Sequence, residues 1–404
     1  MKRNITIVGI GMGNPETMTL QAIHAVEQSD LLIGAQRMLD SFQDMQKPTF
    51  CAYQPEKIKD YLIQNTNYQK PVILLSGDIG FYSGAKKLYQ VLEDYQIDTI
   101  SGISSLVYLC GKLHTAWEDV HCVSIHGREA VLISEIASHQ KTFILAGGNQ
   151  TPAQICRQLL QKGLGTATVS IGENLSYPNE KIVCDRAENL ITYQSEKLCV
   201  MLVTHQNAHR YSLGIADEQF IRDKVPMTKS EVRTVSIAKL QLQPDDIVYD
   251  IGAGTGSVSV ELALQLPSGM VYAVERKPQA LELMIKNQKQ FGAYNLECIL
   301  GEAPEVLKEL PKPDKAFLGG TAGNMEEILR LLLQKNPYIR IVVNVIALES
   351  LTEALKCFQK FGLIHQEVVQ MTIAKAKEVG SYHMMMGQNP VYILSGEGNG
   401  YECP

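Results

Sequence analysis

The sequence lacks the features that mark several classes of protein. None of its hydrophobic runs approaches the roughly 18 apolar residues that a membrane-spanning helix needs. The apolar run Ile5–Val8 is too short for a signal peptide and has no small-residue cleavage site after it. No run of like charge stands out, and the net charge is −6, so the basic imprint of a nucleic-acid-binding domain is missing. We therefore expect a cytoplasmic protein with neither a membrane nor a nucleic-acid partner.

The chain also lacks the side-chain patterns that are typical of metal sites and of nucleophilic catalysis. Its nine cysteines are scattered, and no two of them form a C-x-x-C pair. A zinc site or a redox dithiol is therefore not expected, and reduced thiols fit better. We predict no metal site. Neither half shows a catalytic triad or a carboxylate pair, so the sequence names no catalytic residue.

The sequence does contain alternating strand and helix patterns that predict two α/β domains. Its 404 residues are too many for one ordinary core. Both halves alternate short β-branched runs with helical patterns. The polar stretch His205–Arg210 interrupts this pattern, so we predict domains 1–208 and 209–404. Connections in the second half are too long for hairpins, which predicts a parallel sheet covered on both faces. The predicted strands are Ile5–Ile10, Val72–Leu75, Val120–Ile125, Thr142–Leu145, Thr166–Ile171, Leu198–Val203, Ile247–Asp250, Val271–Val274, Leu296–Leu300, Lys315–Leu318, Ile339–Val345, Ile364–Met371 and Val391–Leu394.

A glycine-rich loop follows the first strand of the second half. Gly252, Gly254 and Gly256 let the backbone turn sharply and approach a ligand where a Cβ would collide. The next helix offers free backbone N–H groups to that ligand. The spacing G-x-G-x-G differs from the G-x-G-x-x-G of dinucleotide-binding loops and suits S-adenosylmethionine, which has no phosphate. Glu275 ends the next strand, where a carboxylate can accept hydrogen bonds from both ribose hydroxyls.

Further motifs of this half carry a family resemblance. Met227–Arg233 precedes the first strand, Gly301–Pro304 follows the third, Gly319 and Gly320 follow the fourth, and Asn389–Val391 lies near the end. Together with the glycine loop they closely resemble the C15-methylating, decarboxylating enzymes of corrin biosynthesis, which have the class I, Rossmann-like methyltransferase fold. The resemblance implies an S-adenosylmethionine site lined by Thr228, Gly252, Ala253, Gly254, Thr255, Gly256, Glu275 and Ala303.

The first half carries three glycine-bearing loops, each after a strand. They are Gly9–Gly13, Ser76–Tyr82 and Ser101–Ser105. One such loop is typical of a plain turn, but three at strand carboxyl ends favour a ligand cleft. The set resembles the tetrapyrrole methylases, class III methyltransferases built from two α/β subdomains. Ser124–Arg128 and Gly172–Leu175 resemble the C5-methylating component of the same pathway. The resemblance implies cofactor contacts from Gly11, Gly13, Gly77, Asp78, Phe81, Ser104 and Ser105.

The first half departs from the family pattern at Met12, Ile79 and Ser101, where proline is usual. The contacts there are expected to come mainly from backbone atoms, so the resemblance holds. His126 and Arg128 would then face the tetrapyrrole.

A substrate that carries several carboxylates should contact basic side chains near the site. In the second half, Lys229 and Arg233 are the candidates because they lie beside the cofactor loop. His383 and the methionines Met384–Met386 are candidates for an apolar wall of the pocket.

Together the halves resemble the bifunctional C5,C15-methyltransferases (decarboxylating) of cobalamin biosynthesis. The resemblance implies one S-adenosylmethionine per domain, precorrin-6B or cobalt-precorrin-6B as substrate, and methylation at C5 and C15 with decarboxylation of the C12 acetate arm. It also implies a homo-oligomer.

Two alternatives stay open. One is a methyltransferase for another substrate such as RNA, which a salt-dependent RNA affinity would reveal. The other is that one half is a non-catalytic binding module, which would bind one equivalent of cofactor instead of two. A dinucleotide-dependent oxidoreductase fits least, because the glycine spacing is wrong for it.

Overall fold

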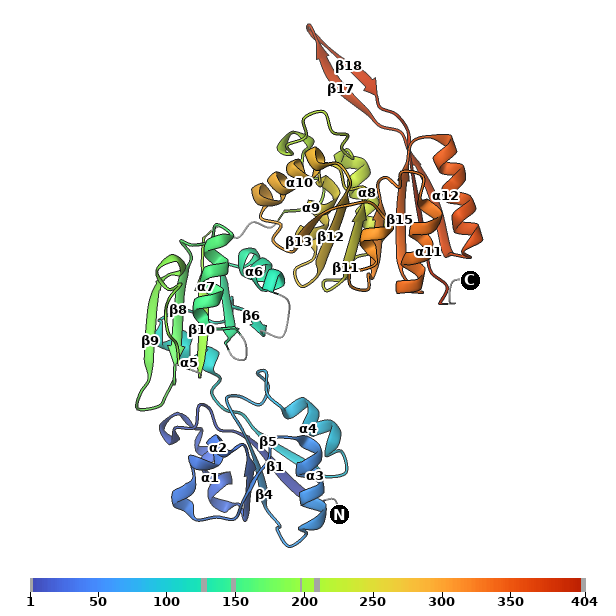
Figure 1. The fold of residues 1–404 in the computed structure, drawn as a ribbon. Coiled ribbons are helices and arrows are strands. Elements are labelled where there is room, and N and C mark those ends of the chain that lie inside the picture. The colour runs from blue at the N-terminus through green and yellow to red at the C-terminus, as the bar shows by residue number, and fades with distance from the viewer. Residues whose placement is uncertain (1–2, 125–128, 147–149, 197, 207–210, 401–404) are drawn as a thin grey trace. The chain divides into compact units, whose positions relative to one another are not determined.

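Two α/β units make up the chain in the computed structural model, which describes all residues except 1–2, 125–128, 147–149, 197, 207–210 and 401–404 (Figure 1). Unit 1 contains residues 1–126 and 140–205, and unit 2 contains residues 127–139 and 206–404. The segment 127–139 therefore groups with unit 2 although unit 1 flanks it in sequence. In the part of the chain that is described, no helix has the length and apolar character to cross a membrane.

The first sheet of unit 1 is fully parallel, with strand order β3-β2-β4-β1-β5. Strands β1, β2 and β4 are apolar and mostly buried, because helices cover both faces. Helix α1 packs on one face with Ala22 and Val26, while α3 and α4 pack on the other with Ile58, Leu62 and Leu88. The elements are β1 (Asn4–Gly9), α1 (Leu20–Gln28), β2 (Leu31–Gly34), α2 (Gln36–Asp40), β3 (Thr49–Cys51), α3 (Pro55–Gln64), β4 (Pro71–Leu75), α4 (Ala85–Val91) and β5 (Gln96–Ile100).

The second sheet of unit 1 is mixed, with strand order β6-β7-β10-β8-β9. Only β6 and β7 pair in parallel, and the other neighbours are antiparallel. Leu106, Leu109 and Cys110 of α5 pack against Phe143 and Leu202 of this sheet. Thr151 and Gln154 form a capping box at the start of α7. The elements are α5 (Ser105–Lys112), β6 (His121–Ser124), β7 (Lys141–Leu145), α7 (Pro152–Gln161), β8 (Thr168–Glu173), β9 (Lys181–Arg186) and β10 (Cys199–Thr204). Helix α6 (Glu129–Ser138), which lies between β6 and β7 in sequence, belongs to unit 2.

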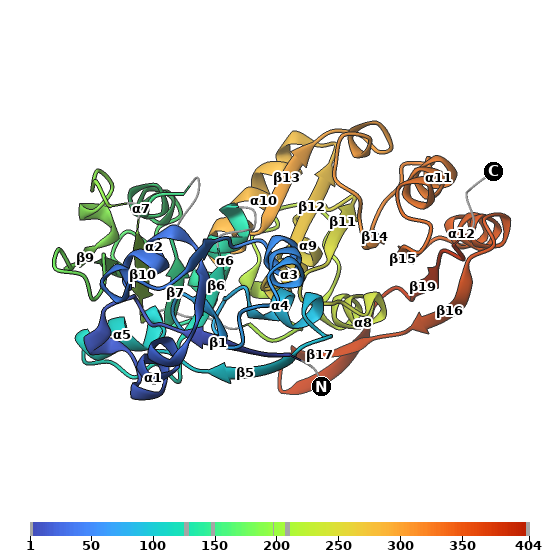
Figure 2. The ribbon, with the colours of Figure 1, turned by 90° about the horizontal axis from the view of Figure 1, so that it is seen from below.

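Unit 2 is built on one seven-stranded sheet with strand order β13-β12-β11-β14-β15-β19-β16, which Figure 2 shows as a continuous row. Strands β13 to β15 are parallel neighbours. Helices α11 and α12 pack on one face, and α8, α9 and α10 on the other. The elements are α8 (Ser230–Leu240), β11 (Ile247–Ile251), α9 (Ser257–Gln265), β12 (Met270–Glu275), α10 (Pro278–Phe291), β13 (Leu296–Leu300), β14 (Lys315–Leu318), α11 (Met325–Lys335), β15 (Arg340–Val345), α12 (Leu348–Lys360), β16 (Ile364–Met371) and β19 (Val391–Glu397).

The predicted parallel sheet of the second half is present in β13, β12, β11, β14 and β15, but the sheet also contains one antiparallel strand, which the prediction missed. Strand β19 lies between β15 and β16 and runs antiparallel to both. The reason lies in the connection, because the chain returns from β16 to β19 through a hairpin and needs no helical crossover.

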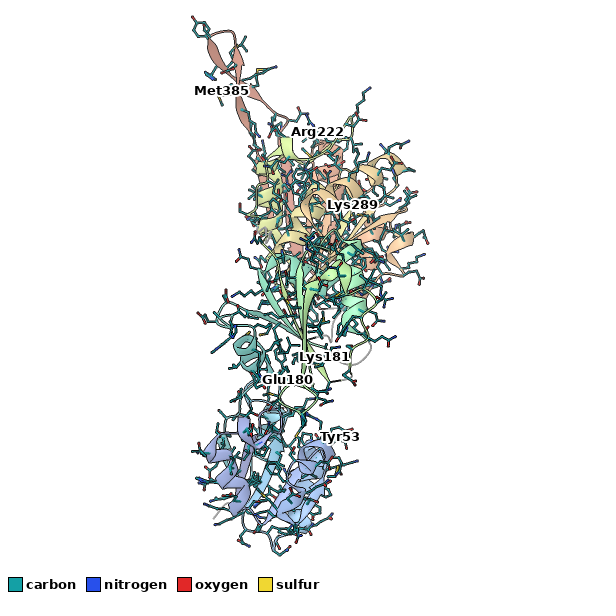
Figure 3. The ribbon with its side chains drawn as sticks, turned by 90° about the vertical axis from the view of Figure 1, so that its left-hand side faces the viewer. Tyr53, Glu180, Lys181, Arg222, Lys289 and Met385 are labelled. Carbon is teal, nitrogen blue, oxygen red and sulfur yellow. The ribbon has the colours of Figure 1, made fainter. Side chains whose placement is uncertain are left out.

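That hairpin consists of β17 (Ala374–Val379) and β18 (Tyr382–Gly387), which pair only with each other. Every residue of both strands is exposed. The hairpin extends away from the seven-stranded sheet, and Met385 lies about midway along it, paired with Ala376 (Figure 3). His383 and Met384–Met386 lie on it, so the expectation that they form a pocket wall is wrong.

Candidate cofactor and substrate sites

Unit 2 contains a cavity of about 890 Å³ at the carboxyl ends of its parallel strands. Loops after β11, β12, β13, β14 and β15 all contribute to its wall. The volume lies within the range of small-molecule sites, and the position is the one at which open α/β sheets bind ligands. The predicted cofactor residues that line it are Thr228, Gly252, Ala253, Gly254, Glu275 and Ala303.

The glycine loop brings backbone atoms together where a side chain would not fit. A Cβ on Gly252 would lie 2.5 Å from the carbonyl oxygen of Gly320, so the loops after β11 and β14 meet backbone to backbone. Gly256 caps α9 with a φ of 77°, and a Cβ there would lie 2.5 Å from Met284 on α10. Gly256 and its neighbour Thr255 do not line the cavity. Gly256 instead allows α9 to pack closely against α10.

Glu275 fastens the glycine loop to the end of β12. Its Oε2 accepts a hydrogen bond from the backbone N–H of Gly254 at 2.9 Å, and its Oε1 accepts one from Lys277 N–H at 2.8 Å. The side chain is buried and lines the cavity. Since each carboxylate oxygen has two lone pairs, both retain capacity to accept hydrogen bonds from a ligand hydroxyl.

Asp250 is a site residue that the sequence analysis missed. It lies in β11 directly before the glycine loop, lines the cavity and is completely buried. Its Oδ2 accepts a hydrogen bond from the Ser259 hydroxyl, while its Oδ1 has no hydrogen-bond partner among the described residues. Burial, together with the nearby charge of Glu275, raises the pKa of Asp250 to about 7. A polar residue in an otherwise apolar strand was the available signal.

Lys229 and Arg233 lie four residues apart, but only one of them faces the cavity. Lys229 lines it, with about a third of its side chain exposed and its Nζ 3.6 Å from Asp217 Oδ2. Arg233 has no exposed surface, and its Nε donates to Glu261 Oε1 at 2.6 Å. It also pairs with Asp217 at 3.3 Å and donates to the Thr228 carbonyl at 2.6 Å.

The prediction that Arg233 meets a substrate is therefore wrong. Its guanidinium points into the core, where carboxylate and carbonyl oxygens already accept its hydrogen bonds. Its Cζ atom also lies 4.8 Å from the centroid of the Phe220 ring. The side chain stabilises the segment before α8 against α9. A buried guanidinium needs such partners, because a charge without them would be costly to desolvate.

A second part of the cavity wall comes from β15 and from the segment before β19. Val343, Val345 and Ile346 give it apolar surface, and Asn344 and Asn389 give it amide groups. The Asn344 Nδ2 donates to the Ser236 hydroxyl at 2.8 Å, which fixes the amide plane. The sequence analysis assigned no role to this wall.

In unit 1 the three predicted loops meet at the carboxyl ends of β4, β1 and β5, which are adjacent in the sheet. Gly11 and Gly77 exchange backbone hydrogen bonds, at 3.1 Å from Gly11 N–H and 2.6 Å from Gly77 N–H. A Cβ on Gly102 would collide with the carbonyl oxygens of Gly77 and Gly9. The structure thus brings Gly11, Gly13 and Gly77 to one end of the sheet, beside the start of α5.

The side chains at this end mainly hold the loops in place. Asp78 accepts hydrogen bonds from Gly102 N–H at 3.2 Å and from Gly80 N–H at 2.8 Å. Ser104 is buried and caps α5, whose first residue is Ser105. Phe81 packs against Phe143, with ring centroids 5.9 Å apart.

The candidate substrate residues His126 and Arg128 lie outside the described residues. Their predicted contact with a tetrapyrrole stays a prediction.

These features define an α/β protein with glycine-bearing loops at the strand ends of both units, and its similarity to known proteins identifies the class as methyltransferase. Residues 218–397 match the precorrin methyltransferase domain family, and residues 4–191 match the tetrapyrrole (corrin/porphyrin) methylases. The chain belongs to the precorrin methyltransferase family.

Two curated relatives illustrate that membership. A probable cobalt-precorrin-6B C(15)-methyltransferase (decarboxylating) of Pyrobaculum calidifontis is 43% identical over 185 residues, which cover 45% of this chain and 94% of the relative. The cobalt-precorrin-6B C(15)-methyltransferase (decarboxylating) of Salmonella typhimurium is 36% identical over 181 residues, or 44% of this chain and 93% of the relative. A crystal structure of precorrin-6y C5,15-methyltransferase from Geobacter metallireducens is 39% identical, covers 46% of this chain and 100% of that chain, and has a TM-score of 0.44.

Proposed function

We propose that this chain uses S-adenosylmethionine to methylate precorrin-6B or cobalt-precorrin-6B at C5 and C15 and to decarboxylate the C12 acetate arm, in cobalamin biosynthesis. Residues 1–208 would carry out the C5 methylation, and residues 209–404 the C15 methylation and the decarboxylation. The observation that carries the proposal is the pair of tandem family matches, one tetrapyrrole methylase and one precorrin methyltransferase, in a single chain. The relatives named for C15 methylation and decarboxylation are matched over nearly their whole length.

The architecture supports this division of labour. Unit 2 has a parallel sheet with the order 3-2-1-4-5 and an antiparallel strand inserted before its last edge strand, as expected for a class I, Rossmann-like methyltransferase. Unit 1 has two sheets, as expected for the two α/β subdomains of a class III tetrapyrrole methylase.

The residues around the unit 2 cavity fit S-adenosylmethionine. Gly252 and Gly254 keep the loop free of side chains, and Glu275 retains acceptor capacity for ribose hydroxyls. The partnerless Oδ1 of Asp250 adds a buried acceptor. We propose one S-adenosylmethionine per unit, which would supply the methyl group. Thr228 and Ala303 would complete the unit 2 site.

The protein's own contribution is to orient and desolvate the reactants. The methyl acceptor is an electron-rich meso carbon, so no strong side-chain base is required. Lys229 is placed to meet a carboxylate of the substrate at the cavity. Val343, Val345 and Ile346 would exclude water from the macrocycle.

The same wall suits decarboxylation. As CO₂ leaves, the electron pair of the broken C–C bond passes into the conjugated macrocycle, and the arm then takes up a proton. An apolar surrounding removes water from the departing carboxylate, which favours the uncharged product over the charged reactant. The residues of the β15 end therefore act by excluding water.

We further propose that the chain is a homo-oligomer and that the β17–β18 hairpin takes part in the contact. Tyr382 is 75% exposed and Met385 is 65% exposed on this two-stranded element. Contiguous exposed apolar side chains mark association surfaces. Light scattering of the wild type and of Met385→Ser checks this, with a lower molar mass expected for the variant. An unchanged mass would contradict the role of the hairpin.

The proposed function is tested by a mass spectrum of the reaction product. The full chain is incubated with S-adenosylmethionine and the hexamethylated-stage corrin precursor, with and without cobalt in separate tubes. We expect a gain of two methyl groups and the loss of one carboxyl group, and the productive tube identifies the form of the substrate. A corrin precursor of unchanged mass in both tubes would contradict the assignment of a corrin substrate.

A further inference from the structure

The guanidinium of Arg37 is hydrogen-bonded to two loops at the candidate site of unit 1. Its Nη1 donates to the Tyr177 hydroxyl at 2.9 Å, and its Nη2 donates to the Ser76 hydroxyl at 3.0 Å. Ser76 begins the loop after β4, and Tyr177 lies in the loop between β8 and β9. Arg37 itself is exposed on the short helix α2. Three separate segments therefore meet at one cation.

The charge of Arg37 is not matched by any anion in the part of the chain that the structure describes. Both of its hydrogen-bond partners are neutral hydroxyls, and no carboxylate oxygen lies within 4.0 Å of it among the described residues. Some other cations of unit 1 are paired with carboxylates. Lys112 lies 3.0 Å from Glu180, and Arg186 lies 3.5 Å from Glu188. Arg37 is held in position without being neutralised.

The location connects this cation to the predicted methylation site. Ser76 directly precedes Gly77, which exchanges hydrogen bonds with Gly11. The Tyr177 hydroxyl oxygen lies 3.1 Å from the position that a Cβ on Gly13 would occupy. The guanidinium therefore stands beside the two loops that the cofactor is expected to contact, and its exposed edge is open to a ligand.

The chemistry of the guanidinium specifies the ligand class. Its planar fork of N–H donors matches a carboxylate in a bidentate geometry, and hydrogen bonds between ions are roughly twice as strong as those between neutral groups. A carboxylate would therefore displace a neutral hydroxyl from Arg37. Holding the side chain beforehand lowers the entropic cost of binding, because a free arginine side chain loses rotamer freedom when a ligand fixes it.

We propose that Arg37 binds a carboxylate arm of the tetrapyrrole substrate and so orients the macrocycle for methylation in unit 1. This inference rests on the proposed function of that unit. The other available carboxylate belongs to the methionyl part of the cofactor, and the two sources differ in which affinity Arg37 controls. The exposed position of Arg37 on α2 favours the arm of the larger ligand.

The test compares three variants of the full chain by the rate of methyl transfer at each carbon. Arg37→Gln should raise the KM for C5 methylation about tenfold or more, because a hydrogen bond to a charged group is lost. Methylation at C15 and decarboxylation in the same tube serve as the internal reference and should not change. Arg186→Gln, on the exposed part of β9, is the matched control and should leave both KM values unchanged.

Tyr177→Phe separates substrate recognition from a structural role. It removes one hydroxyl partner but keeps the Arg37 charge, so the KM for C5 methylation should stay within about twofold of the wild type. If Arg37 merely ties the loops together, Tyr177→Phe should reproduce the effect of Arg37→Gln, and that result would overturn the inference. Arg37→Lys should recover only part of the loss, because an ammonium group lacks the bidentate fork.

A titration with S-adenosylmethionine distinguishes the two carboxylate sources. We expect the same cofactor Kd for the wild type and Arg37→Gln. A weaker cofactor Kd with an unchanged substrate KM would assign Arg37 to the cofactor and overturn the assignment to the substrate. Wild-type protein that transfers no methyl group to C5 removes the proposed function of unit 1 and the inference with it. Normal wild-type transfer with an unchanged Arg37→Gln KM removes the inference alone.

Discussion

The candidate sites of the two units both lie at the ends of parallel strands, but they are built differently. In unit 2 the site is a cavity of about 890 Å³ with carboxylates in its wall, and Asp250 and Glu275 both line it. In unit 1 the loops meet through the glycine backbones of Gly11 and Gly77, as they do at Gly252 and Gly320 in unit 2, and the Asp78 carboxylate accepts hydrogen bonds from Gly80 and Gly102. Unit 1 matches the tetrapyrrole methylases despite its three departures from proline. Contacts made by the backbone depend less on side-chain identity than contacts made by carboxylates.

The largest loss of activity should come from variants that place a large side chain in each candidate site in turn. Gly254 has a φ of 58° and Gly11 a φ of 60°, a region that side chains rarely adopt. Gly254→Arg should reduce C15 methylation and decarboxylation by about a hundredfold or more, because misplacement of bound groups by about 1 Å costs that much. Gly11→Arg should reduce only C5 methylation. Product mass spectra check both variants.

Each glycine variant is the control for the other, because the untouched unit should keep its activity. Loss of both methylations in either variant would contradict the independence of the two sites.

Breaking the buried ion pairs of unit 2 should give the largest loss of stability. Arg233→Met leaves Glu261 buried without its cation, and Asp217 loses a partner. We expect a loss of about 3 to 5 kcal/mol in the free energy of unfolding of unit 2, measured by hydrogen exchange of the β11 amides. Arg222→Met at an exposed position should change it by less than about 0.5 kcal/mol. Equal effects would contradict a structural role of Arg233.

The buried carboxyl of Asp250 should make the stability of unit 2 depend on pH. Its pKa is about 7 in the fold and near 3.8 when unperturbed, so the proton is bound more tightly in the folded state. The stabilisation is fully present below about pH 4 and is lost as the pH rises through about 7. A difference of about 3 pKa units corresponds to about 4 kcal/mol.

Asp250→Asn removes this dependence, because an amide does not titrate. Between pH 4 and pH 8 the variant should gain about 4 kcal/mol relative to the wild type in the free energy of unfolding of unit 2. Urea unfolding at several pH values measures the change. Parallel pH profiles of the wild type and the variant would show that Asp250 is ionised throughout and contradict the raised pKa.

The smallest effects should come from two glycine-to-alanine changes in unit 1. A Cβ on Gly102 meets the backbone of Gly77, so Gly102→Ala should destabilise unit 1 by about 1 to 3 kcal/mol. Gly111 lies in α5 with open space around it, and Gly111→Ala should stabilise the helix by up to about 1 kcal/mol. Calorimetric unfolding of unit 1 compares the signs. A stabilising Gly102→Ala would show that the loops are looser than described.

Local sequence signals predicted much of the fold. The bounds of α10 follow from local signals, because Pro278 opens the helix and Gly292 ends it with a φ of 65°. Runs such as Val72–Leu75 and Lys315–Leu318 are buried strands. By contrast β2 was missed, since a run of three apolar residues before a glycine does not distinguish a strand from a helix.

What could not be predicted depends on contacts between distant residues. The burial of Arg233 requires Glu261, 28 residues away, and only the packing of α8 on α9 brings them together. The pKa of Asp250 depends on its burial beneath the glycine loop, which its position in the sequence does not reveal. The hairpin was read as pocket wall because its methionines are apolar, yet both its strands are exposed.

The most direct test of the central claim is the number of S-adenosylmethionine molecules that one chain binds. Isothermal titration of the purified full chain should give two equivalents, with Gly11→Arg and Gly254→Arg each reduced to one. Two equivalents that fall to one in each variant would place one cofactor in each unit. A single equivalent in the wild type, abolished by only one of the two variants, would contradict the account and leave one unit as a binding module without turnover.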